Sequence, residues 1–171
     1  MKKLHGLAAA CVAALLPAVA APTSYGPLHP LAFLAGHCWT TVIDGGKETD
    51  THCYEWMHDG QQLRDRHVVG GTNQDCAGET VYAFNGERKR VEYRYWNSEG
   101  GLSDGYLEVA DDGTLRFLDD RYVGMDGVVY TFSSEITLPA DGRYRILTRF
   151  KEGDAWKDLW TREFTRQEAA P

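Results

Sequence analysis

Five of the six histidines fall between positions 29 and 67, and two of them stand beside acidic and aromatic residues. His52 lies in the segment Asp50-Thr51-His52-Cys53-Tyr54, and His67 ends the segment Arg64-Asp65-Arg66-His67. Imidazole can act as a general base, a hydrogen-bonding group or a metal ligand, and a neighbouring carboxylate orients the ring. Each of these kinds of chemistry requires side chains that are distant in sequence to meet on one face of the fold.

Regular turn signals predict which side chains share a face. Glycine-containing pairs such as Gly45-Gly46 and Asp59-Gly60 recur between alternating apolar and polar runs, a pattern typical of consecutive antiparallel hairpins. A two-residue loop at each of these two turns sets the register of the first three strands. It places Trp39 opposite His52, and His52 opposite His67.

The neighbouring row on the same face contains His37, Tyr54 and Asp65, whereas Arg64 and Arg66 point to the opposite face. We assign the aromatic face to the interior. Buried imidazoles and carboxylates require partners, so the cluster indicates either a ligand pocket or a self-satisfied polar network. Two tyrosines of a later strand are expected to line the same cavity. The predicted ligand-binding residues are His37, Trp39, His52, Tyr54, Asp65, His67, Tyr93 and Tyr95.

Other chemistry is less well supported by the sequence. His37, His52 and His67 could share a metal ion across neighbouring strands, but no spacing in the chain is a metal motif, and we predict no metal or cofactor. One alternative is an enzyme in which His52 or His67 works with Asp65 as an acid-base pair, although no nucleophile is predicted beside them. The other alternative is a structural module with a filled core.

The elements that must position these residues are almost all strands. A short helical turn is predicted at 31–34, ended by Gly36. The fold class is all-β: a single antiparallel up-and-down β-barrel of about 8–10 strands, because short connections favour closure over open edges. The predicted strands are 37–44, 47–58, 61–69, 79–84, 88–97, 103–110, 114–124, 128–138, 143–151 and 154–165.

The first twenty residues have a different residue pattern from the rest of the chain. Lys2 and Lys3 precede an apolar run, and Ala18-Val19-Ala20 provides small residues, which together predict a secretory signal peptide over 1–20 and one barrel domain over 21–171. Cleavage would remove two positive charges and no acidic residue, and so would change the formal net charge from −7 to −9. We therefore expect a periplasmic or secreted monomer or weak dimer that binds a small molecule, with no nucleic-acid partner and no membrane span in the mature chain.

Three cysteines follow the predicted signal peptide: Cys38, Cys53 and Cys76. The register places Cys38 opposite Cys53 as a hydrogen-bonded pair, with a Cα separation of ~5.5 Å that suits a disulfide. In the alternative, Cys38 and Cys53 form no disulfide with each other, and Cys76 pairs with one of them.

The segment Phe33-Leu34-Ala35-Gly36-His37-Cys38-Trp39 resembles the opening of calycin-like, or lipocalin-like, β-barrels. With the segments around His52, His67, Tyr82 and Tyr95, the chain resembles a group of small secreted bacterial proteins for which no activity is established. This resemblance implies a barrel and small-ligand binding in general terms. The chain departs from the usual lipocalin Gly-x-Trp by one extra residue.

Overall fold

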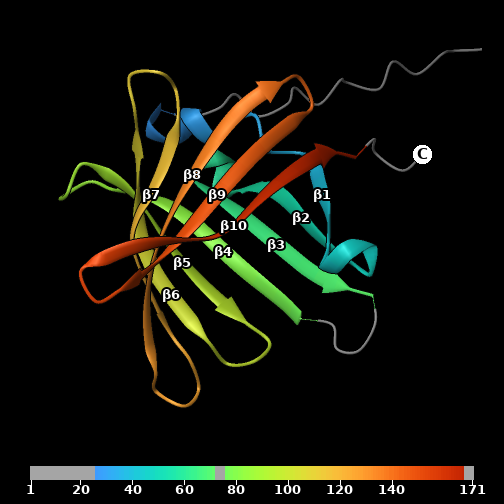
Figure 1. Cartoon of the computed structure of the whole chain (residues 1–171). Coiled ribbons are helices and arrows are strands. Elements are labelled where there is room, and N and C mark those ends of the chain that lie inside the picture. The colour runs from blue at the N-terminus through green and yellow to red at the C-terminus, as the bar shows by residue number, and fades with distance from the viewer. Residues whose placement is uncertain (1–25, 72–75, 168–171) are drawn as a thin grey trace, which may run out of the picture.

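The computed structural model describes residues 26–71 and 76–167, and it is a closed antiparallel barrel in which every strand pairs with its neighbour in sequence (Figure 1). The predicted up-and-down barrel is therefore confirmed. The predicted signal peptide over 1–20 lies outside the described residues. The strands are β1 (Cys38–Ile43), β2 (Glu48–Met57), β3 (Gln62–Gly70), β4 (Cys76–Asn85), β5 (Arg90–Asn97), β6 (Leu102–Val109), β7 (Leu115–Val123), β8 (Val129–Ala140), β9 (Arg143–Glu152) and β10 (Ala155–Arg166).

The register of the first two hairpins is as predicted, since Trp39 pairs with His52 and His52 pairs with His67. The connecting turns are longer than predicted. Each contains a 3-10 segment, η2 (Asp44–Gly46) and η3 (His58–Gly60), in which three successive residues have positive φ. Asp, His and Gly tolerate that backbone region better than most residues, which explains why these types occupy both turns.

The longer turn alters one prediction about the disulfide. Tyr54 N–H donates to the His37 carbonyl at 3.0 Å, so His37 and Tyr54 form a hydrogen-bonded pair. Hydrogen-bonded and non-hydrogen-bonded pairs alternate along an antiparallel ladder, so the next pair, Cys38 and Cys53, is non-hydrogen-bonded. Its Cα atoms are 4.0 Å apart, closer than predicted, and the two residues form the expected disulfide. Cys76 is a free cysteine.

The helical element lies earlier than predicted. It is a 3-10 helix, η1 (Gly26–Leu31), with Pro30 inside it, and residues 32–36 form turns rather than the predicted helical turn. The difference is small in space because Leu34 N–H still donates to the Leu31 carbonyl at 3.0 Å. Leu28, Leu31 and Leu34 are almost fully buried in the apolar core, and we call these three leucines the plug. The segment η1 lies at one end of the barrel (Figure 1).

Much of the apolar core lies next to this plug. Trp39 packs edge-on against Phe33 and in a tilted contact against Tyr144, and its indole N–H donates to the Leu34 carbonyl at 3.2 Å. Leu63 is fully buried in the same core. The first strand thus ties the plug to the barrel wall.

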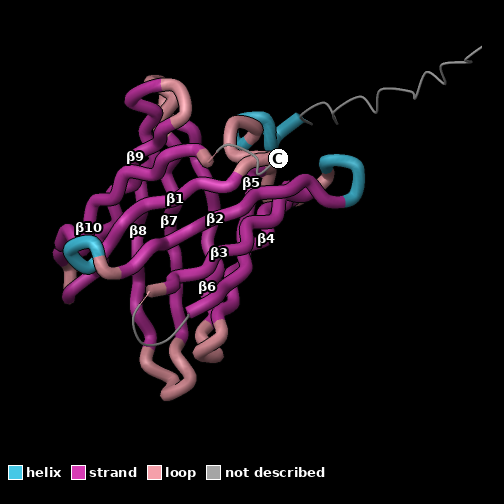
Figure 2. Tube along the Cα trace, turned by 90° about the vertical axis from the view of Figure 1, so that its right-hand side faces the viewer, coloured by secondary structure: helices cyan, strands magenta, loops and turns pink. Residues whose placement is uncertain are grey.

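Closure joins the first and last strands, which lie side by side (Figures 1 and 2). In the described part of the chain, this ladder has only two registered pairs, Trp39 with Arg166 and Thr40 with Thr165. Gln167 N–H extends it by donating to the Cys38 carbonyl at 2.8 Å. The β1–β10 junction is therefore a short seam.

Four register shifts interrupt the later ladders. They occur between Asp104 and Tyr106, between Phe117 and Asp120, between Thr137 and Ala140, and between Asp158 and Trp160. Because side chains alternate along a strand, each extra residue switches the interior-facing positions from odd to even residue numbers, or the reverse. This reversal places Trp160 at the interior, whereas Trp156 on the same strand is 46% exposed.

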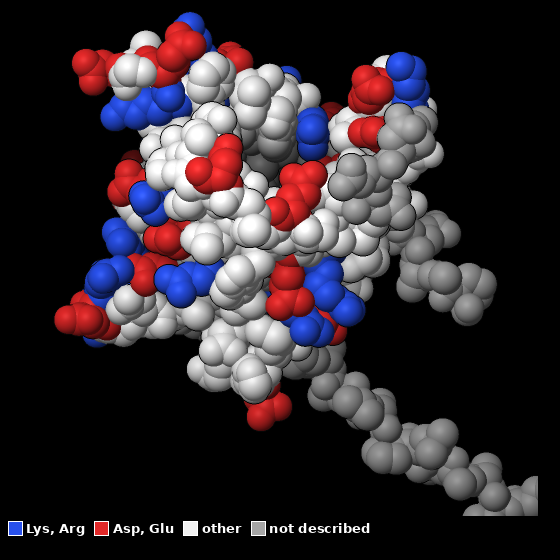
Figure 3. Space-filling view, turned by 90° about the horizontal axis from the view of Figure 1, so that it is seen from below, with Lys and Arg blue, Asp and Glu red and all other residues white. Residues whose placement is uncertain are grey.

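Acidic and basic side chains are interspersed on the outer surface, as Figure 3 shows for one face. Arg64 pairs with Glu55, and Arg66 lies 3.8 Å from the same carboxylate, as expected for outward-facing residues on β2 and β3. Among the described residues, no helix is long and apolar enough to cross a membrane.

Candidate functional site

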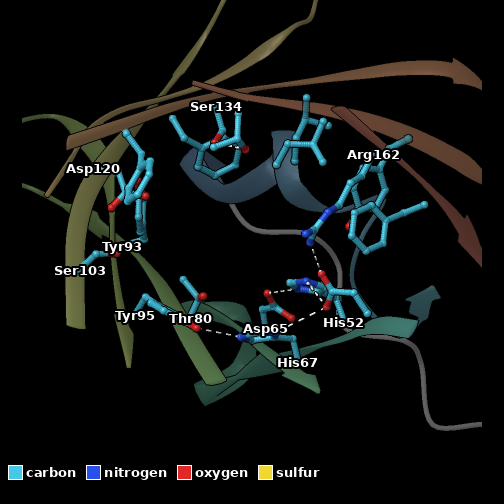
Figure 4. Close-up of a pocket in the computed structure, with 18 of the residues that line it drawn as sticks. His52, Asp65, His67, Thr80, Tyr93, Tyr95, Ser103, Asp120, Ser134 and Arg162 are labelled. Atoms are coloured by element: carbon cyan, nitrogen blue, oxygen red, sulfur yellow. Dashed lines mark hydrogen bonds and ion pairs between the residues drawn. The ribbon is translucent and has the colours of Figure 1, made fainter. Parts of the chain in front are cut away.

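The barrel contains an interior cavity of about 330 Å³ that is not fully enclosed. This volume lies at the lower end of the ~300–1,000 Å³ typical of small-molecule pockets. Aromatic and aliphatic side chains form most of the wall, and two groups of polar residues interrupt it (Figure 4). The lining residues are Asp50, His52, Tyr54, Asp65, His67, Thr80, Tyr82, Tyr93, Tyr95, Ser103, Phe117, Asp120, Tyr122, Phe132, Ser134, Ile136, Tyr144, Ile146, Thr148, Leu159, Trp160, Arg162 and Phe164.

The larger polar group, here called the polar cluster, consists of Asp50, His52, Asp65, His67 and Arg162. His52 Nδ1 lies 2.7 Å from Asp65 Oδ2, and His52 Nε2 lies 3.2 Å from Asp50 Oδ1. Arg162 reaches in from β10 and donates to Asp50 Oδ2 at 2.9 Å. The two imidazole rings stack with their centroids 4.8 Å apart. The predicted meeting of His52, His67 and Asp65 therefore occurs.

His52 is held as a cation by its surroundings. Burial alone would lower its pKa, but the charge of Asp65 and the close approach of Asp50 outweigh burial and raise the pKa to about 10. Burial would raise the pKa of Asp50, yet the two adjacent imidazoles hold it well below its usual value. The cluster thus holds the His52 imidazolium between two aspartates, with the Arg162 guanidinium beside Asp50.

His67 is positioned from the other side by β4 and β5. Its Nε2 lies 3.0 Å from the Tyr95 hydroxyl, and the two rings are in tilted contact with centroids 5.6 Å apart. Gly78 faces this pair from β4, and a Cβ there would overlap His67 Nε2 and approach Tyr95 Cε2 to 2.5 Å. The glycine is therefore required by the close approach of these two side chains.

The second polar group contains Asp120, Ser103 and Tyr93 on the opposite wall (Figure 4). Burial raises the pKa of Asp120, and the nearby Ser103 and Tyr93 hydroxyls offset this only in part. Burial also raises the pKa of Tyr93 well above its usual value. Asp120 is therefore a carboxyl group in an unfavourable environment for its charged form.

Unpartnered polar atoms concentrate in the cavity. Within residues 26–71 and 76–167, the buried side-chain polar atoms that lack a hydrogen-bond partner all belong to cavity-lining residues. Most buried polar groups in proteins are hydrogen-bonded, so such a concentration marks a place where another molecule can complete the network. The atoms are Asp50 Oδ1, Asp65 Oδ1, His67 Nδ1, Tyr93 OH and Asp120 Oδ1.

The structure brings most of the predicted ligand-binding residues to this cavity, which is lined by His52, Tyr54, Asp65, His67, Tyr93 and Tyr95. It does not bring His37 and Trp39 there. The buried Trp39 packs beside the plug, and the half-buried His37 ring lies edge-on to it with centroids 6.4 Å apart. His37 is consequently separate from the two histidines with which we had considered a shared metal ion.

The ligand-binding prediction omitted Asp50, Arg162 and Asp120. The parity of β2 places Asp50 on the same face as His52, so the register alone could have added it. Arg162 and Asp120 each follow a register shift, after which the parity counted from the preceding turn no longer holds. The available signal was chemical: Arg162 is a lone arginine between the aromatic residues Trp160 and Phe164 at alternating positions.

Neither a protein-family profile nor any curated protein sequence matches this chain. The fold and the cavity together define a ten-stranded antiparallel barrel with a buried aspartate–histidine cluster, consistent with the calycin-like architecture that the sequence resembles.

Proposed function

We propose that this protein is a binding barrel that holds one small, largely apolar or aromatic molecule in its interior cavity. The supporting observation is that, in the described part of the chain, the buried polar atoms without a hydrogen-bond partner all belong to residues that line this one cavity. Three of them are carboxylate oxygens, which only accept hydrogen bonds. The preferred ligand should therefore carry hydrogen-bond donors, such as hydroxyl or amine groups, on an aromatic or aliphatic body.

The cavity supports binding over a structural module with a filled core, because it is large enough for a ligand. The acid-base enzyme is less well supported. A histidine with a pKa near 10 remains protonated at neutral pH and is a poor general base, although Asp65 orients it well.

We further propose that residues 1–20 direct export and that residues 21–171, as the mature barrel, work in the periplasm or outside the cell. The Cys38–Cys53 disulfide is compatible with such a compartment. N-terminal sequencing of the exported protein would test this: a mature chain that begins at Ala21 supports the proposal, and an uncleaved chain contradicts it.

Binding can be tested with a matched pair of ligands and a matched pair of variants. The ligands are 2-naphthol, which carries a donor, and 2-methoxynaphthalene, which does not. Ser134→Phe fills the cavity from β8, where the Ser134 hydroxyl lies 2.9 Å from that of Thr148. Ser133→Phe places the same side chain on the outer face of the same strand.

We expect wild type to prefer 2-naphthol, and Ser134→Phe to weaken naphthol binding at least about tenfold, or about 1.4 kcal/mol, relative to Ser133→Phe. His67→Leu should weaken naphthol binding without unfolding the barrel. Calorimetric titrations in the presence of EDTA would measure these affinities. Equal binding by both serine variants, or no naphthol binding by wild type, would refute the proposal.

A further inference from the structure

Three atoms of the polar cluster converge on one point beside the cavity. Asp50 Oδ1 lies 3.2 Å from His52 Nε2 and 3.5 Å from His67 Nδ1. One ligand atom from each of these three residues lies within 4.8 Å of the others. A tetrahedral ion with bonds of ~2.0 Å holds its ligand atoms roughly 3.3 Å apart, so two of these separations already suit metal coordination.

The remaining polar atom of each residue is held by a different neighbour. His52 Nδ1–H donates to Asp65 Oδ2, so a metal ion that displaces the Nε2 proton of the His52 cation would find the Nε2 lone pair available. His67 Nε2 is hydrogen-bonded to the Tyr95 hydroxyl, which leaves Nδ1. Arg162 occupies Asp50 Oδ2 and leaves Oδ1. Metal-binding histidines usually donate their second ring N–H to a carboxylate or another acceptor in this way.

An independent observation comes from the unpartnered atoms. Asp50 Oδ1 and His67 Nδ1 are both buried, both lack a hydrogen-bond partner and face each other at 3.5 Å. The Asp50 side chain is only 5% exposed. A buried carboxylate oxygen and a buried imidazole nitrogen left in this arrangement are costly unless something lies between them.

We propose that Asp50, His52 and His67 bind one divalent transition-metal ion of the zinc class through Oδ1, Nε2 and Nδ1. Two nitrogen ligands and one carboxylate oxygen suit zinc and its first-row neighbours and disfavour Ca²⁺ and Mg²⁺, which take oxygen ligands. Three protein ligands leave a fourth position for water or another ligand, and all three residues line the cavity. Because imidazole coordinates only as the neutral ring, binding releases protons.

The test uses protein without a histidine tag, stripped of metal by a chelator and then titrated with Zn²⁺ by calorimetry and with Co²⁺ by absorption. We expect one ion per chain and the intense visible bands of four- or five-coordinate cobalt. His67→Gln and Asp50→Asn should each weaken Zn²⁺ binding at least about a hundredfold, and Tyr95→Phe about 10–100-fold through His67.

His37→Gln is the matched control, because His37 is a half-buried histidine on the same barrel that does not line the cavity. It should bind Zn²⁺ as wild type does. Far-UV circular dichroism and urea unfolding would show that each variant remains folded. Equal Zn²⁺ affinity in wild type and His67→Gln, or an equal loss in His37→Gln, would overturn the proposal, and either result would leave the proposed organic ligand untouched.

Discussion

At the scale of single residues, the cavity places its charged groups in two different situations. His52 lies between two carboxylates and is stabilised as a cation despite its burial. Asp120 lies on the opposite wall near the Ser103 and Tyr93 hydroxyls, and burial, with a smaller effect of the Asp104 charge, raises its pKa. A raised carboxyl pKa means that the folded protein disfavours the charged form, so Asp120 costs stability wherever it is ionised.

Asp120→Asn should therefore stabilise the protein at neutral pH. In the unfolded chain the carboxyl has its ordinary pKa, and in the folded protein the pKa is higher. The cost is complete above the folded-state pKa, shrinks as pH falls through it and vanishes below the ordinary value near 3.8. Thermal unfolding between pH 3 and pH 7 should show a gain for Asp120→Asn that disappears at the acidic end. Asp119→Asn, at the exposed neighbouring position, is the control, and a gain that is independent of pH would contradict the argument.

The polar cluster shows which residues a sequence can place. His52, Asp65 and His67 were predicted together because two symmetric turns preserve the strand pairs whether the loop has two residues or four. The same lengthening changes which pairs are hydrogen-bonded, which is why the Cα separation of Cys38 and Cys53 was overestimated. Opposed pairs were therefore more predictable than local hydrogen-bond geometry.

At the scale of elements, the barrel depends on a short seam and on bulged strands. The β1–β10 ladder has two registered pairs in the described residues, and the Cys38–Cys53 disulfide links β1 to β2 beside it. The bulges in β7 and β10 turn Asp120 and Arg162 inward. No turn residue signals a bulge within a strand, so these two residues could not be placed by counting from the hairpins.

The disulfide should contribute stability by restricting the unfolded chain. It joins residues with a sequence separation of 15, a loop for which chain entropy predicts about 3 kcal/mol. The double substitution Cys38→Ala/Cys53→Ala should lower the free energy of unfolding by about that amount in urea titrations. A reductant should lower the free energy of unfolding of the wild type to that of the double variant, and it should leave the double variant unchanged. Cys76→Ala, which removes the free thiol, is the control, and a reductant effect that persisted in the double variant would refute this assignment.

At the scale of the whole molecule, the barrel has a packed end and a hollow end. The plug leucines Leu28, Leu31 and Leu34 fill the first, and the cavity with its polar groups occupies the second. The sequence predicted closure and the aromatic interior, because regular turns and alternation determine both. It did not predict how the interior is divided, because that depends on how η1 folds across one mouth.

Two leucine substitutions can test this division, since they remove the same atoms from opposite ends. Leu31 is fully buried in the plug, whereas Leu159 lies at the cavity margin and is 49% exposed. Leu31→Ala should cost about 3 kcal/mol, because it opens a void in packed surroundings. Leu159→Ala should cost less than about 1 kcal/mol, because its atoms already contact solvent. Urea unfolding would measure both values, provided that the dependence of the unfolding free energy on urea concentration is the same in the variants and the wild type. Comparable losses of stability would mean that the two ends are equally packed. The proposed division would then be wrong, and it could no longer explain how the barrel admits a ligand at one end and remains stable.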